Sequence, residues 1–232
     1  MGRGRKESRK VLNNRIIGFV GLDVQDTILY LSRIFFQMGK RVLMADYSES
    51  RALYYSVPVI PGTDTCSELV EYRGTFFTTR AMGRNELAEY DVSLLFLGFS
   101  AGDRLGLCTH IIYTTDGERN HIQRLAALSE HGKGYRQFVF RNAGGRRGRG
   151  RLADFGMKES GMAVCEESAY YCNDSIREKR LREQCQYQNR FCFRGLSRSY
   201  KDYLKATVRA VFPEEALAPG FAGCFRRAEM GE

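Results

Sequence analysis

A short turn, Gly21–Asp26, is the segment whose residue types could carry chemistry. It reads Gly-Leu-Asp-Val-Gln-Asp and lies between an apolar run, Ile16–Val20, and an amphipathic stretch that ends at Gly39. A turn that holds a triphosphate at such a place needs several glycines and a lysine (G-x-x-x-x-G-K-[ST]). This turn has one glycine, no lysine and two carboxylates, which repel phosphate. The pattern therefore predicts a nucleotide-binding type of scaffold without a working phosphate site.

The two carboxylates of the turn, Asp23 and Asp26, have two interpretations. A pair of neighbouring carboxylates can serve acid/base chemistry or bind a metal ion. Acidic residues are also ordinary at helix starts, where Asp26 suits a cap or first-turn position and interacts favourably with the helix dipole. We favour the helix-start interpretation, and we predict no catalytic residue and no metal site.

Apolar runs on both sides of the turn predict an α/β fold. Residues 27–38 place their apolar side chains on one helical stripe, and Gly39 supplies a C-terminal stop. An apolar run at 41–46 follows at once, so residues 16–46 form a βαβ unit with a right-handed crossover and a parallel strand pair. Further strands are predicted at 75–80, 90–98, 110–115 and 137–141, an edge strand at 162–166, and helices at 65–72 and 118–129. The side chains expected on adjacent, buried parallel strands are Ile17, Phe19, Leu43, Leu95 and Ile112.

Composition divides the chain into three parts. Residues 1–12 combine glycines and charges without periodicity, which predicts a disordered basic tail. Residues 13–213 suit one domain, because 232 residues at 43% hydrophobic content can bury one sizeable core. Within it, 168–213 is expected to be mainly helical, and 214–232 to be an irregular tail. The helix at 200–212 could lie on a membrane surface, but it carries only three basic residues, and we favour packing on the domain.

Several classes of protein are excluded by composition. The longest uncharged apolar run, 92–99, is far shorter than the ~20 residues of a transmembrane helix. The N-terminal segment lacks the apolar run of a secretory signal, and we expect a cytoplasmic protein. The seven cysteines include no C-x-x-C pair, which argues against zinc and favours reduced packing cysteines. Three histidines, at 110, 121 and 131, have no nucleophile motif nearby, so no catalytic triad is predicted.

Over most of residues 16–167, these segments in this order resemble the MinD/ParA group of deviant-Walker P-loop ATPases. The most specific part is the helix followed by GKRVLMAD at 39–46. In that group the helix follows K-G-G-x-G-K-T. We align this motif with the sequence by counting back from Gly39, the end of the helix, without gaps. Its signature lysine then falls on Phe19, its phosphate-binding lysine on Val24 and its magnesium-binding hydroxyl on Gln25.

The other positions of the resemblance match in part. Of the group's glycines only Gly21 is present, and no lysine occurs between Val11 and Gly39, so no shift of register restores one. Asp46 matches the first aspartate of the second motif, and Ser48 replaces the second. The metal-associated aspartate of the third motif is Phe96, and Asn142 matches the adenine-side asparagine.

The resemblance implies a single P-loop NTPase-like α/β domain with a mostly parallel central sheet flanked by helices. Loss of the lysine and of a metal carboxylate removes most of the charge stabilisation that phosphoryl transfer needs. Members with eroded P-loops occur in pilus and secretion-system localisation, as in the TadZ/CpaE type. We therefore expect a non-catalytic scaffold that acts through a protein partner or a homodimer, without ATP or ADP as a working cofactor. The alternative is an unconventional ATPase that binds nucleotide through Gly21, Asp46 and Asn142.

The net charge of +9 is concentrated in patches. Residues 1–15 carry six cations against one acid, and the loop Gly144–Arg151 holds glycines and arginines without an acid. The candidates for binding a polyanion, including nonspecific nucleic acid, are the arginines of that loop: Arg146, Arg147, Arg149 and Arg151. The other interpretation is a loop that only keeps the protein soluble.

Overall fold

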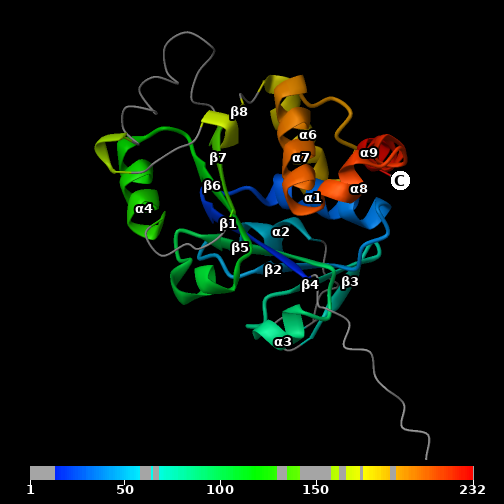
Figure 1. Ribbon diagram of the computed structural model, residues 1–232, viewed down its shortest axis with the longest axis horizontal. Helices are drawn as coiled ribbons and strands as arrows, with labels where there is room; N and C mark the ends of the chain where they lie inside the picture. Colours follow the sequence, from blue (N-terminus) through cyan, green and yellow to red (C-terminus); the bar gives the residue numbers. More distant parts are fainter. Residues whose placement is uncertain are drawn as a thin grey trace, which may run out of the picture.

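The computed structural model describes residues 14–57, 64, 68–129, 135–141, 158–161, 166–172, 175–188 and 192–231. Its centre is an eight-stranded sheet in the order β3-β4-β2-β5-β1-β6-β7-β8 (Figure 1). Every neighbouring pair is parallel except β3 and β4, which are antiparallel. The strands are β1 (Arg15–Gly21), β2 (Val42–Asp46), β3 (Val70–Tyr72), β4 (Thr75–Thr78), β5 (Val92–Gly98), β6 (His110–Thr115), β7 (Tyr135–Arg141) and β8 (Ala169–Cys172).

The central strand of this sheet is β1, which pairs with β5 on one side and β6 on the other. Its apolar run is covered on both faces, as the absence of alternating polar residues indicated. The predicted buried, parallel arrangement of the five core side chains is confirmed, with each at most 1% exposed: Ile17, Phe19, Leu43, Leu95 and Ile112. This establishes the mostly parallel α/β architecture that the sequence predicted.

One face of the sheet is covered by α1 and by the C-terminal helices (Figure 1). Helix α1 (Gln25–Gln37) is buried along nearly its whole length, because α7 and α9 pack on the side that faces away from the sheet. Tyr30 at its middle contacts the rings of Phe193 and Tyr200. The helices on this face are α1, α2 (Ala52–Ser56), α6 (Ile176–Tyr187), α7 (Arg198–Val211), α8 (Pro213–Leu217) and α9 (Phe221–Met230).

The opposite face is covered by shorter elements. These are α3 (Arg84–Leu87), the 3₁₀ helix η1 (Gly102–Leu107) and α4 (Arg119–Ser129), which bury Leu87, Leu105 and Leu125 against the strands. A further 3₁₀ turn, η2 (Glu166–Ser168), precedes β8. None of the helices in the described part of the chain is long and apolar enough to cross a membrane.

Three secondary-structure predictions were wrong. Residues 70–72, expected in a helix, form β3, because Arg73 and Gly74 both have positive φ and make a two-residue hairpin turn into β4. Residues 169–172, expected to be helical, form the parallel strand β8, where the ring of Tyr171 stacks on Phe140 of β7. Aromatic residues of this kind favour a pleated surface.

The C-terminal segment, expected to be irregular, forms α8 and α9. Phe221, Phe225 and Ala228 recur at helical spacing and are buried, and α9 packs on α1. The two glycines at 220 and 223 concealed this periodicity in the sequence. Packing against α1 therefore outweighs the low helix propensity of glycine. The predicted basic tail at 1–12 and residues 162–165 of the predicted edge strand lie outside the described residues.

Candidate functional site

A pocket of about 500 Å³ lies where β1, β5, β6 and β7 end and α1 begins. The carboxyl edge of a parallel sheet is where open α/β folds usually bind ligands. The lining residues come from both faces of the sheet: Gly21, Leu22, Asp23, Gln25, Asp26, Phe99, Asp116, Arg141 and Arg182. The turn singled out in the sequence thus lines a pocket at the expected place.

The centre of the pocket floor is a buried ion pair between Asp26 and Arg141. Both terminal nitrogens of Arg141 donate to the two carboxylate oxygens of Asp26, each at 2.9 Å, and the two side chains are 7% and 2% exposed. Tyr200 of α7 donates to Asp26 Oδ2 at 3.1 Å, and its hydroxyl lies 2.6 Å from Thr27 Oγ1. Burial and the Asp26 carboxylate raise the pKa of Tyr200, so this hydroxyl stays a donor.

Asp26 is therefore more than a helix-start residue. It lies in the first turn of α1, as predicted, but its carboxylate is bound by β7 and α7 rather than by its own helix. The cap position is Val24, whose side chain makes no cap hydrogen bond. Bidentate pairing of a guanidinium with a carboxylate fixes both side chains in one plane. The ion pair thus fastens the start of α1 to the last residue of β7.

Gly21 is required by strand packing. Its φ is +107°, and a Cβ at this position would lie 2.2 Å from the carbonyl oxygen of Thr114 on β6. The N–H of Leu22 donates to that same oxygen at 3.1 Å. The match of Gly21 to the phosphate-binding motif therefore has a structural explanation that involves no phosphate.

The positions aligned with the motif's lysine and metal carboxylate lie in the core. Val24 is 2% exposed and Phe96 is fully buried, and both belong to the core that α1 forms with the sheet. Phe19, at the signature-lysine position, is fully buried as well. None of these three side chains is among those that line the pocket. The apolar side chains at these positions are part of the hydrophobic core.

Asp46 is engaged in holding the loop after β2. Its Oδ1 accepts from the N–H and the hydroxyl of Ser48 at 3.0 and 2.6 Å, and its Oδ2 accepts from the N–H of Tyr54 at 2.8 Å. Asp46 is 3% exposed and does not line the pocket. Ser50, from the same loop, donates to Asp23 Oδ1 at 2.7 Å. The loop thus reaches the pocket rim through Asp23, while Asp46 serves the loop itself.

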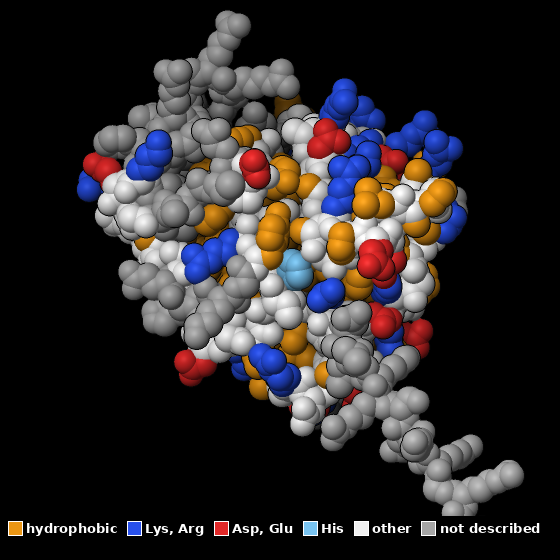
Figure 2. Space-filling model, in the orientation of Figure 1, with side chains coloured by type: hydrophobic (Ala, Val, Ile, Leu, Met, Phe, Trp, Pro, Cys, Tyr) orange, Lys and Arg blue, Asp and Glu red, His pale blue; other side chains and the backbone are white. Residues whose placement is uncertain are grey.

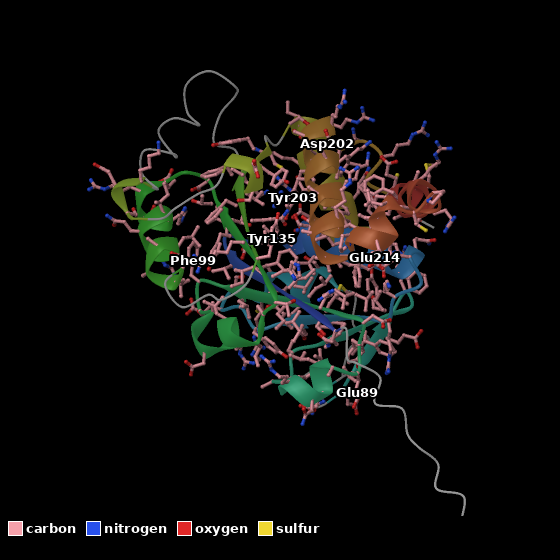
Figure 3. The ribbon with its side chains drawn as sticks, in the orientation of Figure 1. Glu89, Phe99, Tyr135, Asp202, Tyr203 and Glu214 are labelled. Carbon is pink, nitrogen blue, oxygen red and sulfur yellow. The ribbon has the colours of Figure 1, made fainter. Side chains whose placement is uncertain are left out.

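The rim on the α4 side is built around Phe99 (Figure 3). His121 stacks on its ring at 5.7 Å, and the Arg124 guanidinium lies 4.0 Å from the ring centroid. His121 Nδ1 lies 2.8 Å from Asp116 Oδ1, which also accepts from the N–H of Glu118 at 3.0 Å. These contacts hold both Phe99 and Asp116 in place at the end of β5 and β6.

The remaining candidate residues lie elsewhere. His110 is engaged with the carbonyl of Ala210, and burial lowers its pKa, which fits a structural role. Among the described residues no cluster of metal-binding side chains occurs, and burial raises the pKa of Cys108 to about 12. The candidates that fall outside the described residues are His131, Asn142, Arg146, Arg147, Arg149 and Arg151.

Sequence reasoning missed the partners of Asp26. A charged residue at the end of a buried strand, as in QFVFR at 137–141, is a signal that could have identified Arg141. Tyr200 gave no such signal, since it lies 174 residues from Asp26 and on an amphipathic helix where a buried tyrosine is ordinary. The resemblance drew attention to the neighbouring Asn142 instead.

Comparisons with known proteins agree with this architecture. No family model matches the sequence, and no curated protein sequence matches it. Among solved structures, the ATP complex of McdA from Cyanothece aligns with a TM-score of 0.58 at 11% identity, over 87% of this chain and 97% of that one. Its apo form aligns at 0.55 and 12% identity, over 88% and 100%. The pNOB8 ParA bound to nonspecific DNA aligns at 0.54 and 11% identity, over 87% and 99%. The chain has the fold of the ParA- and McdA-like P-loop ATPases.

Proposed function

We propose that this chain is a non-catalytic, MinD/ParA-like scaffold that positions or regulates a partner protein. Its partner would contact the face that carries the former nucleotide cleft, in a localisation role of the kind that atypical members have in pilus or secretion assemblies. The observation that carries the proposal is the buried ion pair between Asp26 and Arg141 at the start of α1.

The residues around this turn do not fit a bound triphosphate. Arg141 lines the pocket, and both of its terminal nitrogens are bound to Asp26. Turning Arg141 toward a phosphate would leave Asp26 buried without its counter-ion, and breaking such a pair costs about 3–5 kcal/mol. Asp23 adds a second carboxylate at the rim, which repels anions. We derive no phosphoryl-transfer step for this site.

The residues at the motif's metal-binding positions are also poor ligands for a magnesium ion. Gln25 stands at the hydroxyl position of the motif, and the carboxylate position is the fully buried Phe96. Asp46 has three donors on its two oxygens already. Without the metal and the lysine, the charge that builds up on a transferred phosphoryl group has no stabilising partner. A binding function therefore accounts for this site better than a hydrolytic one.

Titration of the whole protein with ATP and magnesium by calorimetry tests the proposal. We expect no saturable heat with ATP or with ADP, and phosphate release equal to that of a buffer blank. The Asp46→Ala variant serves as the control for any turnover that is seen. Release that rises with protein concentration and is lost in that variant would establish the alternative, an unconventional ATPase.

A second candidate function, nonspecific binding of nucleic acid, is favoured by one surface. Lys and Arg side chains gather over the C-terminal helices (Figure 2). The exposed cations of α6, α7 and α9 are Arg177, Lys179, Arg180, Arg198, Arg209, Arg226 and Arg227. Together with the arginine loop after residue 144, they would neutralise phosphates without reading sequence.

Salt dependence tests this second candidate. Binding of a labelled duplex, followed by fluorescence anisotropy, should weaken by about one power of salt concentration for each phosphate neutralised. The slope in question is that of the logarithm of the binding constant against the logarithm of the salt concentration. Replacing Arg146, Arg147, Arg149 and Arg151 by alanine should make this slope less steep by up to about four units. Absence of binding at low salt and micromolar protein would end this candidate and leave the scaffold proposal standing.

A further inference from the structure

Helix α6 carries two large apolar side chains that are almost fully exposed. Ile176, its first residue, is 88% exposed, and Tyr187, its last, is 84% exposed. They are three helical turns apart, so both lie on one stripe of the helix. The buried side of α6 holds Glu178 and Cys185, and the stripe lies on the side opposite to them. Two such side chains on one stripe are more than the scattered apolar residues of an ordinary surface.

Two opposite charges complete this stripe. Arg180 and Glu183 lie between Ile176 and Tyr187 at helical spacing, and both are exposed. Neither forms an ion pair with another residue in the part of the chain that the structure describes. From the start of the helix to its end, these four residues, the α6 stripe, read apolar, positive, negative, apolar.

The α6 stripe is complementary to itself in the antiparallel direction. Ile176 and Tyr187 are equally far from the point between residues 181 and 182, and so are Arg180 and Glu183. A two-fold axis through that point therefore places Ile176 against Tyr187 of a second copy, and Arg180 against Glu183 of that copy. A parallel pair would instead bring Arg180 against its own equivalent, which is unfavourable. The order of the charges selects the antiparallel pair.

The flanks of the stripe fit the same arrangement. Lys179 and Gln186 lie on one side of it, and Arg177 and Gln184 lie on the other. In an antiparallel pair, equal flanks meet and run in opposite directions. Each of these cations then lies near an amide side chain, which offers an acceptor oxygen, and not near its own equivalent.

We propose that α6 is the interface of a weak homodimer, in which a second copy of this chain lies antiparallel across the α6 stripe. The dimer needs no nucleotide, so it goes beyond the scaffold function above and does not depend on it. The 12 residues of α6 span about 18 Å. One helix pair of this length lies at the low end of specific interfaces, which bury ~1,200–2,000 Å². The chain is therefore monomeric when dilute and dimeric when concentrated.

Sedimentation velocity of the full chain without nucleotide, from micromolar to submillimolar protein, tests this. We expect the sedimentation coefficient to rise from the monomer value to the dimer value. Arg180→Glu and Glu183→Arg should each weaken the dimer about tenfold, because the symmetry repeats each repulsion twice. Arg119→Glu makes the same charge change on an exposed residue of α4, on the opposite face of the sheet, and should leave the dimer unchanged.

A mixture of the two α6 variants is the most specific test. In a pair that joins Arg180→Glu to Glu183→Arg, every contact across the axis is again between an acid and a base. We expect the mixture to dimerise within about threefold of the unmodified chain, although neither variant does so alone. A mixture no stronger than its components, equal effects of the α4 and α6 variants, or a chain that stays monomeric at submillimolar protein would overturn the inference.

Discussion

At the scale of single residues, the turn between β1 and α1 is explained by packing and pairing. Gly21 allows the strand to leave the sheet beside Thr114, Val24 fills the core, and Asp26 binds Arg141. Val24 and Asp26, two residues of the turn that differ from a phosphate-binding motif, each have a contact that accounts for the residue type. Defined contacts with the core, β6 and β7 therefore hold the turn in place.

The ion pair makes a prediction about stability. Arg141→Met should lower the free energy of unfolding by about 3–5 kcal/mol, because it leaves Asp26 buried without its partner. The double variant Asp26→Asn, Arg141→Met should recover part of that loss, since neither charge then remains. Urea denaturation of the single and double variants measures the coupling. Losses that simply add would show that the two side chains do not stabilise each other.

Gly21 makes a second prediction at this scale. Gly21→Ala should destabilise the protein by more than ~1 kcal/mol, because the new Cβ meets the carbonyl oxygen of Thr114 and φ is positive. Gly39→Ala is the matched control, since Gly39 also has a positive φ, +76°, but nothing lies within 4 Å of its Cβ position. Thermal melts should show the larger loss at Gly21. Equal losses would mean that strain alone, and not contact with β6, explains the glycine.

At the scale of elements, the C-terminal helices complete the domain. Helix α7 supplies Tyr200, which donates a hydrogen bond to Asp26, and α9 covers the outer side of α1. Glu178 couples two of these helices, because it accepts from the N–H of Ser175 at 2.8 Å and from the N–H of Ser197 at 2.9 Å. These serines are the N-caps of α6 and α7, so one carboxylate holds both helix starts.

This carboxylate predicts a pH dependence. Burial by itself raises the pKa of Glu178, but the hydrogen bonds from Ser175 and Ser197 outweigh it and hold the pKa below its ordinary value. Its contribution to stability is therefore present above the unfolded-state pKa and is lost as the pH falls through the lower, folded-state value. Glu178→Gln should be less stable at neutral pH, and the difference should shrink in acid. A difference that stays constant down to pH ~3 would contradict this coupling.

At the scale of the whole molecule, the sequence predicted the sheet but not its edges. The central strands were identifiable because strands covered on both faces are continuous apolar runs. The edge strands β3 and β8 are short, and few of their side chains are buried, so they form no continuous apolar run in the sequence. Helix α9 was missed because glycines interrupt its apolar pattern. In the candidate site, the sequence alone identified Gly21, Asp23 and Asp26 as residues of one turn. Arg141 lies 115 residues from Asp26, and only the fold brings the two together.

The central proposal is that the pocket at the start of α1 does not bind nucleotide. Its most direct test is a calorimetric titration of the full chain with ATP and magnesium at low ionic strength, where any attraction of charge is strongest. The account predicts heats equal to those of dilution at every ratio, and the same result with ADP. A saturable isotherm with one site per chain would contradict it.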